Sequence, residues 1–397
     1  MAVKKVRNHI SQDLALLVLS KLPLKSLKRF GCVNKTWSLL FENPNFITMF
    51  GDNFISIYHS YYDDTSFILH QFVYKAHIRS YLHLLSSRSF ENRLKLDLPT
   101  PLQQEDPVLY IWGSSTNNGT LCLSNGNHNE VNVIPPSPME SVSPYWSSLI
   151  CFYGFGYDCV RDDYKIIRRL AYFPLSEEDL LYLNLLEDAQ SEEKIFYDDV
   201  WEIYSLRCNT WEKLDVDLPL NSIEDILYSK EYILYTNDGI CHWLSKNNDQ
   251  LWLVSFDLSS YVYFTTNTPI PTTDPSFDYG MVARLVMLNG SIALISWYVG
   301  KTTFDILILG ELGVSESWTK LFTIGPLPSY IQEPIGVGRN GDIFFQKKDK
   351  KIVCYDLSTR MVEEELGLEE APSNRIIYKK EWFDKSNNRL VGFLVLN

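Results

Sequence analysis

The chain has 397 residues, of which 45% are hydrophobic and 21% are charged, a balance that excludes disordered and fibrous classes of protein. It contains no apolar run of the roughly 18 residues that a membrane-spanning helix needs, so we expect no membrane partner. Its seven cysteines are scattered and include no C-x-x-C pair, which predicts free thiols, no zinc, and a cytoplasmic or nuclear location.

The formal charge of −13 is unevenly distributed. Residues 1–50 carry eight Lys or Arg side chains against only Asp13 and Glu42, a net charge of +6. A basic patch can bind nucleic acid, but the acidic remainder of the chain would repel phosphate. We therefore expect the N-terminal segment to bind an acidic protein and the chain to bind no nucleic acid.

Three short helices are predicted in the first 45 residues. Apolar residues at helical spacing, with Ser11 as the N-cap, predict a helix over residues 11–22 that ends at Pro23. Two further helices are predicted over residues 24–30 and 33–41. Three helices of this length bury little core, so either a partner or the rest of the same chain is expected to cover their apolar faces.

The remainder of the chain contains a repeat. Gly239, Gly290 and Gly341 each follow Asn or Asp, precede a strand-like run, and stand 51 residues apart. Gly119 begins a similar run 120 residues before Gly239, which is two periods and about 18 residues. We assign the surplus to an acidic insertion over residues 176–199, which is a candidate for target contact, although a solvated loop is the commoner explanation.

A second motif recurs in step with the glycines. An aromatic residue, then Ser or Asp, then Leu, stands at residues 204–206, 256–258 and 355–357. A period near 50 with several strands per unit is typical of a β-propeller of the kelch size class, here of about six blades. An open β-sandwich is the alternative architecture.

The predicted fold is therefore an α+β multidomain chain. It consists of a helical module over residues 1–48, connecting and propeller-closing strands over 49–104, and a large all-β domain over 105–397. In the connecting part, strands at residues 54–58 and 66–74 are expected to pair with 389–396 and close the last blade.

The sequence from Asp13 to Trp37 resembles the F-box of plant F-box proteins over residues 10–46, although Ser11 replaces the usual Pro and Leu17 a frequent Glu. The resemblance implies binding to the acidic adaptor Skp1 and, through it, to a cullin. It assigns the Skp1-binding surface to seven residues: Leu14, Val18, Leu22, Pro23, Leu27, Val33 and Trp37.

The β region resembles the F-box-associated interaction domain of plants, also found in S-locus F-box proteins. The resemblance rests on residues 154–158, 163–167, 201–211 and 316–321 and spans roughly residues 105–365. A Trp-Asn-Pro strand that usually follows the position of Cys122 is missing here, which predicts a shortened first blade.

No catalytic, cofactor-binding or metal site is predicted. The G-x-G-x-x-G over residues 336–341 precedes a strand, whereas a dinucleotide site requires a helix there. Asp162 and Asp163 are interpreted as solvated turn residues, and Cys122 and Cys241 as buried strand residues.

The resemblance implies a non-catalytic substrate adaptor of an SCF (Skp1–cullin–F-box) ubiquitin ligase, whose β domain binds an unidentified target protein. Two alternatives stay open: a ligand-binding or hydrolytic propeller with a helical cap, and a Skp1-binding protein that acts outside any ligase.

Overall fold

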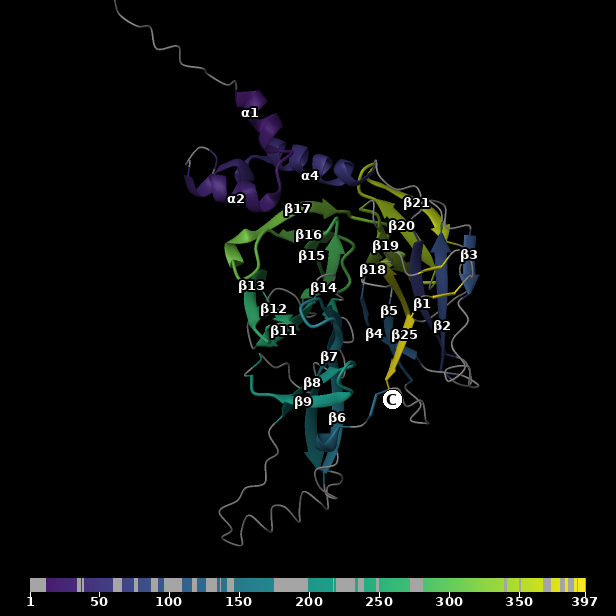
Figure 1. The fold of residues 1–397 in the computed structure, drawn as a ribbon. Coiled ribbons are helices and arrows are strands. Elements are labelled where there is room, and N and C mark those ends of the chain that lie inside the picture. The colour runs from purple at the N-terminus through teal and green to yellow at the C-terminus, as the bar shows by residue number, and fades with distance from the viewer. Residues whose placement is uncertain are drawn as a thin grey trace, which may run out of the picture. The chain divides into compact units, whose positions relative to one another are not determined.

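A computed structural model describes most of the chain in two compact units. Unit 1 comprises residues 1–65, 86–91 and 268–370, and unit 2 comprises residues 66–85, 92–267 and 371–397. Figure 1 draws the helices and strands coloured by residue number. The described residues are 12–33, 37, 39–59, 66–74, 78–86, 92–95, 109–115, 120–125, 134–135, 137–140, 146–174, 199–216, 218, 233–234, 239–247, 250–271, 281–338, 341–349, 351–366, 373–378, 383–384, 389–390 and 392–396. Among them, no helix combines the length and the apolar composition needed to cross a bilayer.

Helices come first, as predicted. They are α1 (Gln12–Leu19), α2 (Leu24–Val33), the 3-10 helix η1 (Leu39–Glu42) and α4 (Pro44–His59). Of the third predicted helix, over residues 33–41, residues 34–36 and 38 lie outside the described residues. Val33 is the last residue of α2, Trp37 is helical, and η1 begins at Leu39.

Helix α4 corrects the sequence prediction of a strand at residues 54–58. Its side chains Phe46, Phe50 and Phe54 recur every four residues, the first two buried in the core of unit 1 and the third packed against it. The Asn43 side chain caps the helix by accepting hydrogen bonds from the backbone N–H groups of Asn45 (3.0 Å) and Phe46 (3.3 Å). Aromatic and β-branched residues favour a strand locally, but the period of the buried positions is that of a helix.

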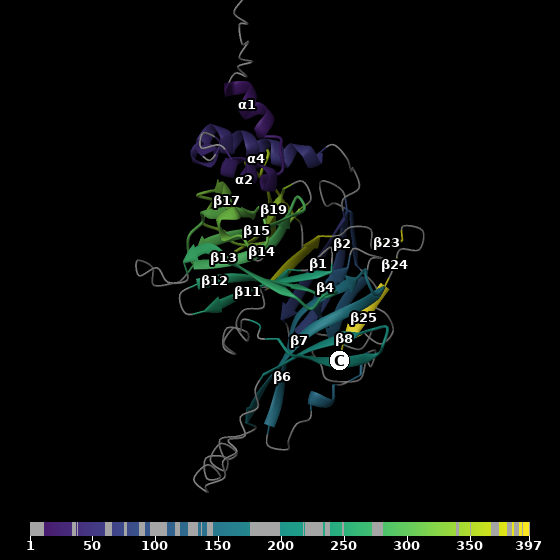
Figure 2. The same cartoon turned by 60° about the vertical axis from the view of Figure 1, so that its left-hand side comes forward.

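Unit 1 contains two four-stranded antiparallel sheets. In Figures 1 and 2, α4 lies over these sheets. The first consists of β14 (Met281–Leu288), β15 (Ser291–Tyr298), β16 (Phe304–Leu309) and β17 (Trp318–Ile324), and the second of β18 (Ile331–Val337), β19 (Ile343–Lys347), β20 (Ile352–Asp356) and β21 (Met361–Leu366).

The remaining sheets lie in unit 2, apart from the end of β13. The first two are four-stranded: β6 (Trp146–Asp158), β7 (Asp163–Pro174), β8 (Val200–Ser205) and β9 (Thr210–Leu214); then β10 (Ile233–Leu234), β11 (Ile240–Asn247), β12 (Gln250–Asp257) and β13 (Tyr263–Pro271). The others have the strand orders β22 (Ser373–Tyr378), β1 (Ser66–Tyr74), β2 (Ile78–Ser86), β3 (Asn92–Lys95); β25 (Gly392–Leu396), β5 (Thr120–Asn125), β4 (Leu109–Ser115); and β23 (Phe383–Asp384), β24 (Arg389–Leu390). Separate sheets of three or four strands argue against the sandwich alternative.

The predicted repeat corresponds to equivalent turns. Gly239, Gly290 and Gly341 have φ angles of 75°, 74° and 86°, and each stands directly before or within two residues of the second strand of its sheet. A φ in this range favours glycine over every other residue, which explains the recurrence.

The aromatic-Ser/Asp-Leu motif ends the third strand of three sheets. Four residues after Ser205, Asp257 and Asp356 stand Asn209, Tyr261 and Arg360, all with φ between 54° and 61°. Asp257 and Asp356 each accept a hydrogen bond from the backbone N–H two residues on, at 2.7 and 2.6 Å. These side-chain bonds hold the turn that leads into the fourth strand.

The closing strands pair differently from the prediction. Strand β1 pairs antiparallel with β22, whereas β25 pairs parallel with β5. The C-terminal segment does join an N-terminal part of the β region, but strand composition alone does not specify which edge it meets.

Candidate functional site

Helix α1 presents an exposed apolar face. Leu14, Leu17 and Val18 are 52%, 45% and 54% exposed, and their spacing places them on one side of the helix. An uncovered group of large aliphatic side chains is typical of a surface that another protein covers.

The opposite side of α1 is attached to unit 1. Leu19 is buried in the same core as Leu27 and Phe46, and Leu16 packs against it. The Ser20 hydroxyl donates a hydrogen bond to the Leu17 carbonyl oxygen (2.9 Å) and accepts one from the Asn53 side chain of α4 (2.8 Å). The C-terminal end of α1 is therefore fixed while its apolar face stays open.

Helix α2 packs onto the turn between β16 and β17. Leu24 and Leu27 are buried in the core of unit 1, with Leu27 only 2% exposed. The Lys25 ammonium lies 2.9 Å from the Glu311 carboxylate, and Lys28 donates a hydrogen bond to the Glu316 carbonyl oxygen (3.1 Å). Burial lowers the pKa of Lys28, whereas the hydrogen bond from Lys25 lowers the pKa of Glu311.

These contacts change the interpretation of the basic N-terminal segment. Lys25, Lys28 and Arg29 contact the chain's own β16–β17 turn, so they are partly engaged before any acidic partner binds. Lys21, by contrast, is exposed beside the apolar face of α1.

The seven residues assigned from the resemblance occupy different environments. Leu14, Val18 and Pro23 are exposed, Leu22 and Trp37 are half-buried against the core of unit 1, and Leu27 belongs to that core. Val33 ends α2, and its side chain is outside the described residues.

Three exposed apolar residues near this surface were not among the seven. They are Leu17, Phe30 and Leu39, at 45%, 39% and 56% exposed. Phe30 contacts Trp37 edge to face, with ring centroids 5.7 Å apart. Leu17 and Phe30 share a helical face with assigned residues, and this spacing is the signal that would have identified them.

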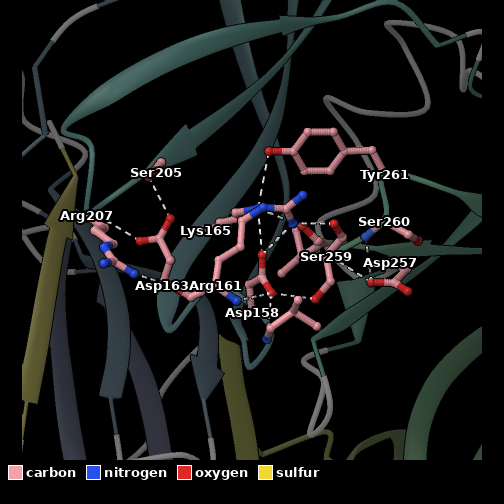
Figure 3. A network of polar contacts seen from close by, with 12 residues as sticks. Asp158, Arg161, Asp163, Lys165, Ser205, Arg207, Asp257, Ser259, Ser260 and Tyr261 are labelled. Carbon is pink, nitrogen blue, oxygen red and sulfur yellow. Dashed lines mark hydrogen bonds and ion pairs between the residues drawn. The ribbon is translucent and has the colours of Figure 1, made fainter.

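Unit 2 contains a buried polar network at the turn between β6 and β7 (Figure 3). The Lys165 ammonium lies 2.8 Å from Asp158 Oδ2, and the two side chains are 2% and 0% exposed. Lys165 also donates hydrogen bonds to the Leu258 carbonyl oxygen (3.0 Å) and the Tyr261 hydroxyl (3.2 Å), and the Ser259 hydroxyl donates to Asp158 (2.7 Å). The network joins the β6–β7 turn to the β12–β13 turn.

The charges in this network are mutually satisfied. Burial alone would raise the pKa of Asp158, but hydrogen bonds from Lys165, Ser259 and Arg161 outweigh it and hold that pKa well below its ordinary value. A carboxylate bonded on both oxygens, with its pKa lowered, is a structural clamp and a poor general acid or base.

Several other titratable groups in the described part of the chain are hydrogen-bonded or buried. The interpretation of Asp163 as a solvated residue was wrong: its side chain is buried and accepts hydrogen bonds from the Ser205 hydroxyl (2.6 Å) and the Arg207 N–H (2.8 Å). Asp162 accepts a hydrogen bond from the Tyr157 hydroxyl. Burial raises the pKa of the Cys151 thiol to about 11 and also raises that of Cys241. No group of three metal-ligating side chains occurs among the described residues.

Comparison with known proteins agrees with this organisation. A family profile described as the F-box associated beta propeller domain matches residues 111–387, and one described as the F-box domain matches residues 8–48. The chain belongs to the F-box-associated β-propeller family. The three- and four-stranded sheets are the blades of that fold, and F-box proteins are in general substrate adaptors without catalytic activity of their own.

Several Arabidopsis thaliana proteins are similar to this F-box-associated propeller protein. F-box protein CPR1 is 23% identical over 92% of this chain and 86% of its own length. Putative F-box protein At3g16210 is 30% identical over 40% of each chain. The crystal structure of dipeptidyl peptidase 4 from Porphyromonas gingivalis aligns with 76% of this chain and covers 44% of the peptidase chain, at 11% sequence identity. The TM-score is 0.34, so this similarity supports no conclusion about fold or function.

Proposed function

We propose that this protein is the substrate-recognition subunit of a Skp1–cullin–F-box ubiquitin ligase. The observation that carries the proposal is the exposed face of α1, formed by Leu14, Leu17 and Val18, within a segment that matches the F-box domain. This face binds the Skp1-like adaptor, and the propeller binds a target protein. Other subunits transfer ubiquitin.

The attachment of the F-box helices to unit 1 supports this role. Leu24 and Leu27 of α2 and Phe46 of α4 belong to one apolar core with the strands of unit 1. A rigid connection between the adaptor-binding helices and a target-binding domain keeps a bound target at a defined distance from the ligase. The resulting high effective concentration is how a non-catalytic subunit accelerates transfer.

The proposal is tested by measuring Skp1 affinity for the full chain and for Leu14→Asp with Val18→Asp. Both side chains are exposed, so the variant should fold, and charges in the apolar contact should weaken binding by about 100-fold or more. Val160→Asp, at a 76% exposed position in unit 2, is the control and should bind normally. Failure of the wild-type chain to bind Skp1, or equal binding by the double variant, contradicts the proposal.

Cullin recruitment separates a ligase subunit from a Skp1-binding protein that acts elsewhere. We expect the chain, Skp1 and cullin to co-elute as one complex in size-exclusion chromatography. A stable Skp1 complex that excludes cullin would support the second role and reject the ligase.

A further inference from the structure

One end of the sheets in unit 1 is covered by the F-box helices. Asn289, in the β14–β15 turn, donates a hydrogen bond to the Phe54 carbonyl oxygen of α4 (3.1 Å), and Ile55 lies against Gly341 in the β18–β19 turn. Leu24 of α2 lies against Gly310, where the β16–β17 turn begins. Since alternate turns of an antiparallel sheet lie at opposite ends, the turns at the other end face away from these helices.

Three segments form this other end: residues 299–303 between β15 and β16, 325–330 between β17 and β18, and 347–351 around the β19–β20 turn. Backbone hydrogen bonds connect them. Leu327 N–H donates to the Thr302 carbonyl oxygen (2.9 Å), and Lys348 N–H donates to the Tyr330 carbonyl oxygen (2.7 Å). We call these three segments the distal surface of unit 1.

The distal surface is basic on a chain that is acidic overall. Its described residues carry four lysines against Asp349, a net charge of +3, whereas the whole chain carries −13. The lysines are Lys301, Lys347, Lys348 and Lys351. Nearby, Asp305 is neutralised by Lys320, whose ammonium lies 3.1 Å away.

Exposed apolar area accompanies the positive charge. Val299 is 47% exposed and Tyr330 is 45% exposed. The Lys347 ammonium lies 5.2 Å from the centre of the Tyr330 ring and 3.2 Å from Asp349, which restrains both side chains. A restrained aromatic ring among lysines suits a ligand that carries both carboxylates and an apolar side chain.

We propose that the distal surface binds an acidic, aromatic-containing segment of the target protein. The inference rests on the proposed function and makes it more specific, because this surface faces away from the adaptor-binding helices within the same compact unit. Carboxylates of the target contact Lys301 and Lys348, and an apolar side chain packs on Tyr330 and Val299.

The test uses two labelled ten-residue peptides, one of glutamate only and one in which phenylalanine alternates with glutamate. We expect the full chain to bind both and to prefer the second. Lys301→Glu with Lys348→Glu should weaken both about tenfold or more, since attraction becomes repulsion at two contacts. Tyr330→Ala should remove the preference for phenylalanine while leaving the all-glutamate peptide nearly unchanged.

Charge reversal elsewhere is the matched control. Lys95→Glu with Lys213→Glu makes the same change in net charge at two exposed positions of unit 2, outside the distal surface. Equal weakening by both double variants, or none by the first, overturns the proposal. Normal Skp1 affinity of Lys301→Glu with Lys348→Glu is expected and separates a failure here from a failure of the ligase role.

A further variant distinguishes a target protein from the chain's own acidic insertion, residues 176–199, as the occupant of the distal surface. Glu177, Glu178 and Asp179 replaced by Gln, Gln and Asn should leave peptide affinity unchanged if the surface is open to a partner. A gain of about tenfold would show that this segment covers the surface and would overturn the proposal.

Discussion

The two compact units bury different kinds of side chain. Among the described residues of unit 1, Arg284 is the one buried charged side chain, and a continuous apolar core extends from the strands into α2 and α4. The described residues of unit 2 include six buried charged side chains: Asp158, Asp163, Lys165, Arg168, Arg169 and Glu202. Apolar burial makes the F-box helices part of unit 1, whereas ion pairs fix specific turn-to-turn and strand contacts in unit 2.

The buried charges of unit 2 form ion pairs with short distances between opposite charges. Arg168 lies 2.9 Å from Glu202 and 2.6 Å from Glu140, and its guanidinium also stacks 3.5 Å from the centre of the Trp211 ring. Such pairs add little net stability relative to apolar residues, but loss of one partner leaves a buried charge without compensation. Unit 2 should therefore be more sensitive to single charge changes than unit 1.

The largest expected effect is that of Lys165→Met in unit 2. Asp158 would remain buried with fewer donors, which should lower the free energy of unfolding of this unit by about 3–5 kcal/mol. Hydrogen exchange of peptides from β6 and β7 measures it, with Lys213→Met at an exposed position as the control. A change below about 1 kcal/mol would mean that the pair does not hold the turns together.

In unit 1, Leu27→Ala should have the next largest effect. Leu27 is 2% exposed in the shared core, so its truncation should destabilise unit 1 by about 2–5 kcal/mol. Leu14→Ala, in the 52% exposed position of α1, should change stability by less than about 0.5 kcal/mol. Chemical denaturation checks both, and equal effects of the two variants would show that α2 is not integrated in the core.

Acid should weaken unit 2 through His242. Burial lowers the pKa of this histidine to about 4, and its Nδ1 lies 2.8 Å from the Ser255 hydroxyl. Because the unfolded chain binds the proton at about pH 6.5 and the folded unit only near pH 4, stability falls as the pH drops through this interval, by up to about 3 kcal/mol. His242→Gln should flatten the pH dependence of exchange in β11 and β12 over that interval, and an unchanged slope would assign the effect to other groups.

The smallest effect is expected at the contact between α2 and the β16–β17 turn. Lys25 and Glu311 are 49% and 35% exposed, so Glu311→Gln should reduce stability by less than about 1 kcal/mol, and less again at high salt. Thermal melts at low and high salt measure this difference. A loss of several kcal/mol would mean that charge, and not Leu24 and Leu27, attaches the helix.

The repeat could be predicted from the sequence because each turn needs a residue with unusual backbone geometry. Glycine at positions 239, 290 and 341 meets the requirement for positive φ, so the spacing of the blades can be recognised from a single sequence. A strand was predicted within what is helix α4, because aromatic residues occur in both helices and strands. The closing strand pairs were predicted wrongly, because strand pairing depends on segments far apart in the sequence.

The environment of the predicted F-box residues could be inferred only in part. Helical spacing groups Leu14 with Val18, but it cannot distinguish the open face of α1 from the buried Leu27, which depends on the blade beneath α2. The Asp158–Lys165 pair joins two turns through Ser259, about a hundred residues further along the chain, and no local pattern specifies that contact. The acidic segment 176–198 lies outside the described residues.

Hydrogen exchange with and without Skp1 tests the central claim most directly, because it reports on each helix separately. If the exposed face of α1 is the adaptor-binding site, peptides spanning residues 12–19 should gain protection on Skp1 addition, whereas β6 and β7 of unit 2 should be unchanged. Leu14→Asp with Val18→Asp should abolish that protection. Unchanged exchange in α1 when Skp1 is in excess would contradict the account.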